Sequence, residues 1–350
     1  MLKNIKYFYT LDILRGLAGL SIVIWHFQHF YYFQPSFIRS SQPYYNFFYF
    51  FYNHGHLAVI IFFSLSGFIF FWLYYEKIKT ELVSGKKFFL LRFSRLYPLH
   101  FITLIIVFLL QLYSIKKTGT YIIYINNDLK HFLLNFFFIS GWGGYEGLSY
   151  NAPIWSVSLE LFAYIIFFLF SKYIYKKRYI ILLIIICLTF INSKFAFVCY
   201  YFFIGGLAYL ALAKINIKNK KMIYIIILLV SIIIITGIIF FNYNNHLSKR
   251  LDAINLGIIN FTLIVTLAIA QYRFKKLGNR LSKIGNLTYG SYLWHFPIQL
   301  VILLFFRDIF FFNLDISFLF YILTVILISV LSYKFIEINI QNRIRNLSLN

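Results

Sequence analysis

Arg15 and His26 lie eleven positions apart in one segment, residues 11–33, that is otherwise apolar enough to cross a bilayer. Ionisable side chains are costly in lipid, so such a pair is a candidate functional site by default. Eleven steps of an α-helix amount to roughly three turns and about 16 Å, so the two side chains share a face at different depths. This spacing suits a cation anchored near one membrane surface and an imidazole that does proton-transfer or nucleophilic chemistry deeper in.

Asp12 offers a structural alternative for Arg15. It precedes the arginine by three residues, so the two side chains can form an ion pair at the cytoplasmic end of the helix. His26 could likewise be a hydrogen-bonded core residue. A buried imidazole is in general neutral, however, which is the form that a general base needs.

Three further charged residues lie at or near the start of later apolar segments, two at the entry of the third and one in the fourth. Arg92 and Arg95 share a helix face at i and i+3, and their guanidinium groups present donor pairs suited to phosphate or carboxylate. Simple anchoring at the cytoplasmic surface is the alternative. Glu160 lies about two turns into a segment that begins at Pro153, where a carboxylate needs a partner such as Arg or His.

Tyr292 and His295 form a fourth polar constellation, three residues apart on one face of an apolar segment. Pro297 follows and must leave one upstream carbonyl without its helical donor. His295 could therefore be catalytic, or it could merely satisfy the backbone near this proline.

The composition identifies the class of protein. The 350 residues are 61% hydrophobic and 12% charged, with a mean hydropathy of +0.77, which is far from a soluble domain. The net charge of +23 would suggest nucleic acid in a soluble protein, but the basic residues fall between the apolar segments, which excludes a nucleic-acid partner. Cys187 and Cys199 lie within apolar stretches and form neither a metal-ligand nor a disulfide motif.

Apolar stretches of about 20 residues predict an all-α bundle of about ten transmembrane helices in a single domain, residues 1–350, without a further soluble domain. The predicted segments are 10–33, 56–75, 95–114, 153–171, 179–193, 195–213, 222–242, 254–272, 286–306 and 317–337. The fifth and sixth are separated by only three residues, 192–194, and a fusion of the two would leave nine helices.

The distribution of positive charge favours ten helices over nine. With the N-terminus inside, the cytoplasmic segments hold roughly three times as many Lys and Arg residues as the outer loops. Both termini are therefore expected in the cytoplasm, and membrane lipid is an expected partner. The longest connection, 114–151, is then extracytoplasmic, and its apolar stretch 131–142 is too short to span, which indicates an interfacial or re-entrant segment.

Taken in order, five motifs resemble those of the integral membrane acyltransferase 3 family. They are Leu-Asp-x-Leu-Arg-Gly-x-Ala with a later His, Phe-Phe-x-Leu-Ser-Gly-Phe, Arg-x-x-Arg-x-x-Pro, Trp-Ser-x-Ser-x-Glu and Tyr-x-x-Tyr-Leu-Trp-His-x-Pro. The resemblance covers residues 8–337. Two departures are Leu161, where the family often has a second acidic residue, and His100, where it often has Tyr.

The resemblance implies a multi-pass enzyme of the bacterial cytoplasmic membrane that O-acylates surface or exported carbohydrates. Acyl-CoA, most simply acetyl-CoA, would be the co-substrate, and polysaccharide, lipopolysaccharide or glycolipid the acceptor, with no bound cofactor or metal. Carried over residue by residue, the resemblance assigns three roles. Catalysis falls to His26, Arg15 and Glu160, donor binding to Arg92 and Arg95, and the acceptor or supporting site to Trp155, Ser158, Tyr292 and His295.

Two mechanisms remain open at this stage, because His26 could remove a proton from the acceptor hydroxyl or carry the acyl group itself. A carboxylate at Glu160 could orient the imidazole. A transporter or flippase of a glycolipid or polysaccharide precursor is the alternative function. It would also bury charges among polytopic helices, although such proteins usually show repeats or paired broken helices, and neither is found in this sequence.

Overall fold

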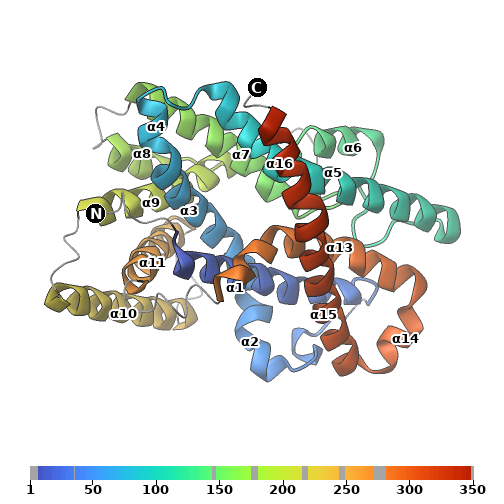
Figure 1. Cartoon of the computed structure of the whole chain (residues 1–350). Helices are drawn as coiled ribbons and strands as arrows, with labels where there is room; N and C mark the ends of the chain where they lie inside the picture. The colour runs from blue at the N-terminus through green and yellow to red at the C-terminus, as the bar shows by residue number, and fades with distance from the viewer. Residues whose placement is uncertain are drawn as a thin grey trace. The chain divides into compact units, whose positions relative to one another are not determined.

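The computed structural model describes residues 7–34, 36–143, 147–174, 180–214, 220–243, 249–271 and 281–347. Within these ranges every regular element is helical and none is a strand, in agreement with the predicted all-α class (Figure 1). The α-helices are α1 (Tyr9–Trp25), α2 (Tyr45–His54), α3 (Ala58–Phe70), α4 (Glu76–Lys79), α5 (Gly85–Thr118), α6 (Leu129–Phe136), α7 (Ile154–Leu169), α8 (Ile180–Leu188), α9 (Lys194–Lys214), α10 (Lys220–Tyr243), α11 (Lys249–Ala270), α13 (Thr288–Phe305), α14 (Arg307–Phe312), α15 (Leu314–Ser332) and α16 (Ile338–Leu347).

Shorter helical segments connect several of them. The 3₁₀ turns are η2 (His26–Tyr31), η3 (Arg39–Ser41), η4 (Gly55–Leu57) and η7 (Ser282–Leu287), and the π-helical turns are η5 (Phe71–Tyr75), η6 (Phe170–Ile174) and η8 (Tyr333–Glu337). The turn η2 continues α1 without a break and carries His26 as its first residue. His26 therefore sits in a 3₁₀ turn and not in the α-helix that the sequence predicts.

Seven helical stretches of the described chain are long and apolar enough to cross a membrane. They are Tyr9–Tyr31, Tyr45–Lys79, Gly85–Thr118, Ile154–Ile174, Lys194–Lys214, Arg250–Ala270 and Leu314–Asn346. Each corresponds to one of the ten predicted segments. The count of ten and the cytoplasmic placement of both termini stay predictions.

The other three predicted segments, the fifth, seventh and ninth, are also helical. The fifth is α8, which is only 9 residues long and separate from α9, and the seventh is α10. The ninth is α13, whose polar residues lower its mean hydropathy. The orientation in the membrane was predicted from the Lys and Arg residues between the helices, and many of these lie outside the described residues. They are Lys3, Lys6 and the basic positions within 175–179, 215–219 and 272–280.

The chain divides into two compact units. The first comprises 1–15, 60–84 and 162–285. Its apolar core joins the start of α1 to α3, α9 and α11. A Cβ on Gly67 would overlap the main-chain oxygen of Phe202, and one on Gly205 would overlap that of Ser64. Helices α3 and α9 therefore approach each other through small residues, as helices in lipid commonly do.

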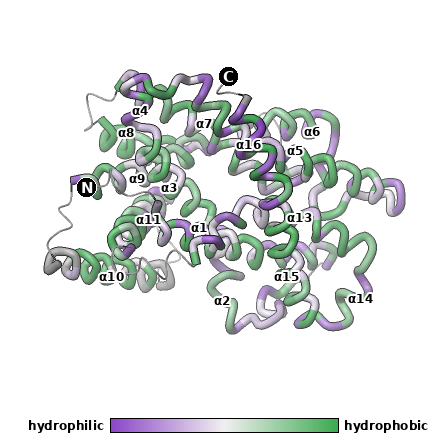
Figure 2. Tube along the Cα trace, viewed as in Figure 1, coloured by the Kyte–Doolittle hydropathy of each residue, from purple (hydrophilic) through white to green (hydrophobic). Residues whose placement is uncertain are grey.

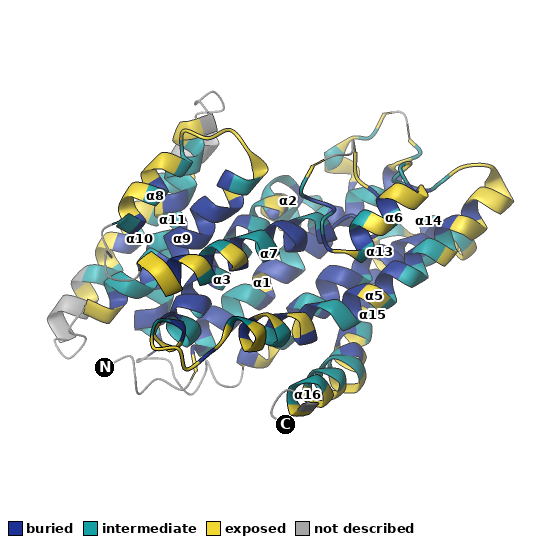
Figure 3. Ribbon diagram, turned by 90° about the horizontal axis from the view of Figure 1, so that it is seen from above, coloured by how far each residue is buried: buried dark blue, intermediate teal, exposed yellow. Residues whose placement is uncertain are grey.

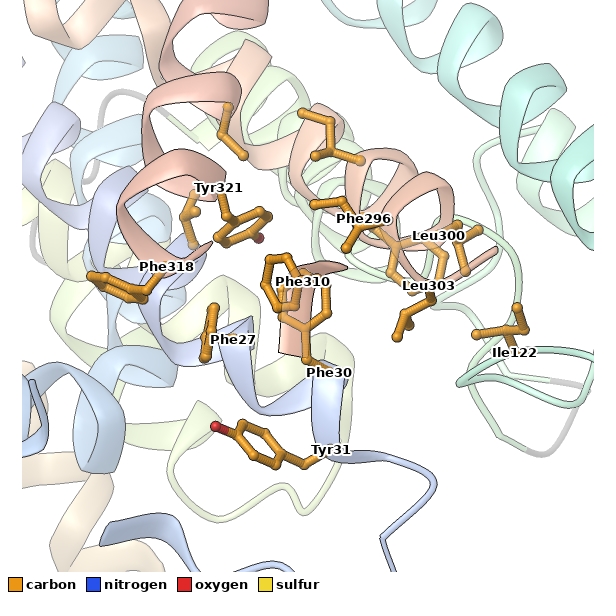
Figure 4. Close-up of a cluster of buried hydrophobic side chains, with 14 of the residues drawn as sticks. Phe27, Phe30, Tyr31, Ile122, Phe296, Leu300, Leu303, Phe310, Phe318 and Tyr321 are labelled. Carbon is orange, nitrogen blue, oxygen red and sulfur yellow. The ribbon is translucent and has the colours of Figure 1, made fainter. Parts of the chain in front are cut away.

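The second unit comprises 16–59, 85–161 and 286–350. Its core is aromatic and surrounds η2, with Phe27, Phe30, Phe310, Phe318 and Tyr321 among its members (Figure 4). The Phe30 and Phe310 rings stack with centroids 4.3 Å apart. The large buried side chains of Phe27, Phe30 and Tyr31 hold the turn that carries His26.

Hydropathy and burial differ from one helix to the next. Figure 2 colours most of α15 as hydrophobic and much of α16 as hydrophilic. In Figure 3, α9 and α13 are largely buried, whereas no described residue of α16 is. Large apolar side chains are nevertheless exposed along several helices, for example Leu183 on α8 and Phe320 and Leu323 on α15. Apolar surface on this scale is what lipid tails cover in a membrane protein.

Candidate active site

The turn η2 places two histidine side chains on the same face. His26 and His29 are three residues apart, and side chains at i and i+3 of a 3₁₀ helix eclipse each other. Their ring centroids are 4.8 Å apart. The sequence analysis selected His26 and passed over His29, although the spacing of three was visible in the sequence.

Hydrogen bonding defines the tautomer of His26. Its Nδ1 lies 2.9 Å from the main-chain oxygen of Ile22. A carbonyl can only accept, so Nδ1 carries the hydrogen and donates it. The neutral ring then has its lone pair on Nε2, the nitrogen that can take a proton or attack a carbonyl. The side chain is 9% exposed, which keeps this nitrogen largely out of bulk solvent.

His295 on α13 has the same tautomer for the same reason. Its Nδ1 lies 3.2 Å from the main-chain oxygen of Ser291. Its Nε2 is buried and has no hydrogen-bond partner among the described residues, and the side chain as a whole is 0% exposed. An unsatisfied acceptor at this depth is expensive unless a ligand completes it.

The backbone near Pro297 does not need His295. The carbonyl that this proline deprives of its helical donor is that of Leu293, four residues earlier. It accepts a hydrogen bond of 3.1 Å from Asn151 Nδ2. Asn151 therefore satisfies the carbonyl that the proline frees, whereas His295 bonds the Ser291 carbonyl on the same helix, and a catalytic role of His295 stays a prediction.

The two histidines face each other. The ring centroids of His26 and His295 are 4.7 Å apart and the planes are inclined by 34°. Each ring has its Nδ1 hydrogen committed to a carbonyl, so each offers an Nε2 lone pair in a buried setting. Two imidazole acceptors beside each other form a site for a hydroxyl group, whose proton one of them can remove.

Three residues that the sequence analysis did not select support this pair. Gln299 on α13 is 0% exposed and its Nε2 donates to the main-chain oxygen of His26 at 2.8 Å. Its Oε1 lies 3.0 Å from His29 Nδ1. Tyr124, in the connection between α5 and α6, places its hydroxyl 3.2 Å from His29 Nε2. Burial raises the pKa of the Tyr124 phenol, so this hydroxyl remains a donor.

Arg15 belongs to the first unit, where its guanidinium is held at two points. One nitrogen pairs with Asp12 at 2.5 Å. Nε and Nη2 also donate to the main-chain oxygen of Gly285, at 3.2 and 3.1 Å. The ion pair between Asp12 and Arg15 that the sequence offers as an alternative is therefore present. If Arg15 also takes part in the reaction, its guanidinium does so while bound to Asp12 and Gly285.

Helix α13 carries further polar side chains on the face that bears His295. Tyr292 donates to the main-chain oxygen of Pro153 at 2.7 Å and lies 2.7 Å from Ser156 Oγ. Ser156 Oγ also lies 3.2 Å from the same Pro153 oxygen, so the two hydroxyls share this acceptor and either can donate in the bond between them. Tyr292 thus ties α13 to the first turn of α7.

Glu160 lies on α7 within electrostatic range of Tyr289 and Tyr292. The His26 ring packs against the rings of Trp25, His29 and His295, and its Nδ1 bonds the Ile22 carbonyl. A contribution of Glu160 to the histidine pair stays a prediction.

Ser158 and Trp155 hold the loop that precedes α7. Ser158 Oγ accepts from the main-chain nitrogen of Gly141 at 2.7 Å and donates to the Trp155 main-chain oxygen at 2.8 Å. The Ser158 carbonyl also accepts from Trp142 Nε1 at 2.8 Å. These contacts give both residues a supporting geometry, with no direct contact to the histidines among the hydrogen bonds described.

Arg92 and Arg95 occupy different surroundings on α5. Arg92 is 7% exposed, whereas Arg95 is exposed. Arg95 lies in electrostatic range of Tyr289 and of Glu337, the last residue of η8. Glu337 was not selected from the sequence, since nothing in its local pattern connects it with a residue more than two hundred positions earlier. No three His, Cys or acidic side chains of the described residues are arranged to hold a metal ion.

Comparison with known proteins agrees with the motifs. The model of a family described as an acyltransferase domain, the acyltransferase 3 family, matches residues 8–334. A protein of the Acidianus two-tailed virus named "Putative acetyltransferase ORF330" is 23% identical over 299 residues, which is 82% of each chain. No solved structure matches the chain. The match over almost the whole length, together with the apolar helices, identifies this protein as a multi-pass membrane member of the acyltransferase 3 family.

Proposed function

We propose that this enzyme is an O-acyltransferase of the bacterial cytoplasmic membrane that moves an acyl group, acetyl in the simplest case, from cytosolic acyl-CoA to a carbohydrate hydroxyl. The acceptor is a cell-surface or exported polysaccharide, lipopolysaccharide or glycolipid. The observation that carries the proposal is the pairing of His26 with His295, 4.7 Å apart, each with Nδ1 bonded to a carbonyl. Their Nε2 lone pairs supply the base that transfer to a hydroxyl requires.

In direct transfer, the acceptor hydroxyl lies against the two Nε2 atoms. His26 Nε2 takes its proton while the oxygen forms a bond to the thioester carbonyl carbon. The carbon–sulfur bond then breaks and the CoA thiolate leaves. The proton held by His26 finally neutralises the thiolate, so the products are the ester and CoA thiol.

In covalent transfer, His26 Nε2 itself attacks the thioester and displaces the CoA thiolate, which gives an acyl-imidazolium because Nδ1 keeps its hydrogen. The acceptor hydroxyl then attacks this intermediate while His295 Nε2 takes its proton. The bond between His26 Nε2 and the acyl carbon breaks, which restores the neutral imidazole, and the proton on His295 passes to the CoA thiolate. The buried and unsatisfied Nε2 of His295 gives this route a second base.

The donor side of the proposal rests on Arg92 and Arg95, helped by Lys86 and Lys87 at the start of α5. Guanidinium groups bind phosphate through paired charge-assisted hydrogen bonds, and the CoA nucleotide carries several phosphates. Arg15, near the cytoplasmic end of α1, would guide the thioester toward His26. Glu160 would supply charge next to the tyrosines of α13, and Trp155, Ser158 and Tyr292 would support the acceptor side.

The test is acyl transfer by the purified protein in liposomes, given acetyl-CoA labelled in the acetyl group and a surface glycan fraction. We expect thiol release and label on the glycan, both lost in His26→Ala and retained in His54→Ala. If His26→Ala is inserted normally and still transfers the label, the assignment is wrong. Movement of glycolipid without thioester cleavage would instead favour a transporter.

A further inference from the structure

Three histidines of the second unit lie together, yet their hydrogen bonds differ in kind. His26 and His295 each bond a main-chain carbonyl through Nδ1. His29 instead has both ring nitrogens beside side chains, with Nδ1 at 3.0 Å from Gln299 and Nε2 at 3.2 Å from Tyr124. The difference indicates that the three rings have different roles.

The amide of Gln299 decides the tautomer of His29. Gln299 Nε2 faces the His26 carbonyl, which can only accept, so the amide cannot be turned the other way without losing this bond. Oε1 therefore faces His29 Nδ1 and accepts its hydrogen. His29 Nε2 is then an acceptor and receives the Tyr124 hydroxyl hydrogen.

The same amide fixes the main chain of the turn. Gln299 is fully buried, with 0% exposure, and reaches the His26 carbonyl from a position 273 residues later in the sequence. The Tyr321 hydroxyl of α15 accepts a further bond from Gln299 Nε2 at 3.1 Å. A single side chain thus joins the His26 backbone, the His29 ring and α15.

We propose that Gln299 is the positioning residue of the reaction. It keeps both ring nitrogens of His29 in hydrogen bonds, one to Gln299 itself and one to Tyr124, so that His29 supports the site and does not react. It also fixes the main chain of η2, so that His26 Nε2 and His295 Nε2 are the two reactive nitrogens. The consequence for catalysis rests on the proposed function. The geometric part, protection of His29 by Gln299, does not.

The experiment compares Gln299→Leu with Gln271→Leu in the full-length protein. Leucine keeps the approximate size but removes the amide. Gln271 is a matched control, because it is also buried and its Nε2 donates to a distant main-chain oxygen, that of Tyr7, within the first unit. Tyr321→Phe is a milder third variant that removes one of the three partners of Gln299.

The activity measurement separates kcat from KM. We expect Gln299→Leu to lower kcat about 100-fold with little change in the KM for acetyl-CoA, because a displaced catalytic group loses its alignment with the reacting atoms. Tyr321→Phe should lower kcat severalfold in the same manner, and Gln271→Leu should retain it. Equal losses of kcat in Gln299→Leu and Gln271→Leu would overturn the proposal, and so would an unchanged kcat in Gln299→Leu.

The second measurement is independent of activity. Diethyl pyrocarbonate adds to unprotonated imidazole nitrogens, and mass spectrometry locates the modified histidines. In the unaltered protein His29 should be modified more slowly than His26, and its rate should rise at least tenfold in Gln299→Leu and severalfold in Tyr321→Phe. An unchanged His29 rate in both variants would refute the positioning role even if the enzyme proves to be an acyltransferase. If no variant and no parent protein transfers acetyl, the proposed function fails, while the modification pattern still decides the position of His29.

Discussion

The Asn151 side chain donates a hydrogen bond of 3.1 Å to the main-chain oxygen of Leu293, the carbonyl that Pro297 leaves without a helical donor. Asn151 is 0% exposed and precedes α7, whereas Leu293 lies in the middle of α13. The bond therefore locks two elements of the second unit together at the level of His295. The Leu293 carbonyl thus has its donor without help from His295, whose Nδ1 bonds the Ser291 carbonyl instead.

Asn151→Ala should lower the free energy of unfolding by about 1–3 kcal/mol, because it leaves a buried carbonyl unpaired. In a Pro297→Ala background the new main-chain N–H can bond Leu293, so the same substitution should cost less there. A double-mutant cycle from denaturation in detergent micelles would measure the coupling, which we expect to exceed about 0.5 kcal/mol. Equal costs in both backgrounds would contradict this interpretation.

Gly67→Ala should disrupt the contact between α3 and α9. Its Cβ would meet the main chain at Phe202, which cannot rotate away, so we expect a loss of about 1–3 kcal/mol from forced overpacking. Gly237→Ala is the matched control, because its Cβ would lie 2.8 Å from Ile259 Cδ1, the mobile end of a side chain. Thermal unfolding of both variants checks the prediction, and equal stabilities would count against it.

Arg15→Lys tests whether the arginine does more than form an ion pair. Lysine can keep the charge next to Asp12, but it cannot also supply the donors that reach the Gly285 carbonyl through Nε and Nη2. We expect a change in stability of roughly 1 kcal/mol and a loss of acyl transfer of at least about tenfold. Retention of full transfer in a less stable protein would make Arg15 structural only.

Arg95→Ala should weaken binding of acyl-CoA. The exposed guanidinium would lose charge-assisted bonds to donor phosphate, so the KM for acetyl-CoA should rise about tenfold while kcat changes little. Lys79→Ala removes another basic side chain, one paired with Glu76 in the first unit, and should leave KM unchanged. The prediction would be refuted if both variants raised KM equally, or if neither did.

Asp128 provides a pH-dependent prediction outside the spanning segments. Its Oδ1 accepts from the main-chain nitrogen of His131 at 2.8 Å and caps α6, which lowers the pKa of the carboxyl. A lowered pKa means that the stabilisation is present above the ordinary value of about 4 and is lost as the pH falls through the folded-state value. The protection of the α6 amides from hydrogen exchange, taken relative to the intrinsic exchange rate at each pH, should therefore fall at acid pH, and Asp128→Ala should show the lower protection already at neutral pH. Protection that does not change with pH would oppose this assignment.

The sequence predicted the elements more readily than the contacts between them. Apolar length suffices to predict a helix, and Pro297 alone predicts an unpaired carbonyl in α13. Asn151 as its partner could not be predicted, because 142 residues separate it from Leu293. The structure of α1 was also predicted only in part, since nothing in the residues from His26 onward distinguishes a 3₁₀ turn from a continued α-helix.

In the candidate site, too, single residues were predicted more readily than the contacts between them. His26 and His295 carry a chemical signal of their own, an imidazole in an apolar segment. Gln299 carries none, since an amide in a membrane helix has many uses and its link to His26 exists only in three dimensions. A role of Glu160 at the imidazole stays a prediction, and its position near Tyr289 and Tyr292 could not be foreseen from spacing along the chain.

The turn η2 also affects how the first segment fits a bilayer. A 3₁₀ helix rises about 2.0 Å per residue and an α-helix about 1.5 Å. The six residues of η2 therefore lengthen the segment by about 3 Å beyond the length expected from its residue count. A helix that is longer than the hydrocarbon layer must tilt or deform the bilayer around it. Because His26 is the first residue of η2, the extra length lies beyond it, so the depth of His26 in the bilayer depends on the α-helical part of the segment and on any tilt, and not on the 3₁₀ turn itself.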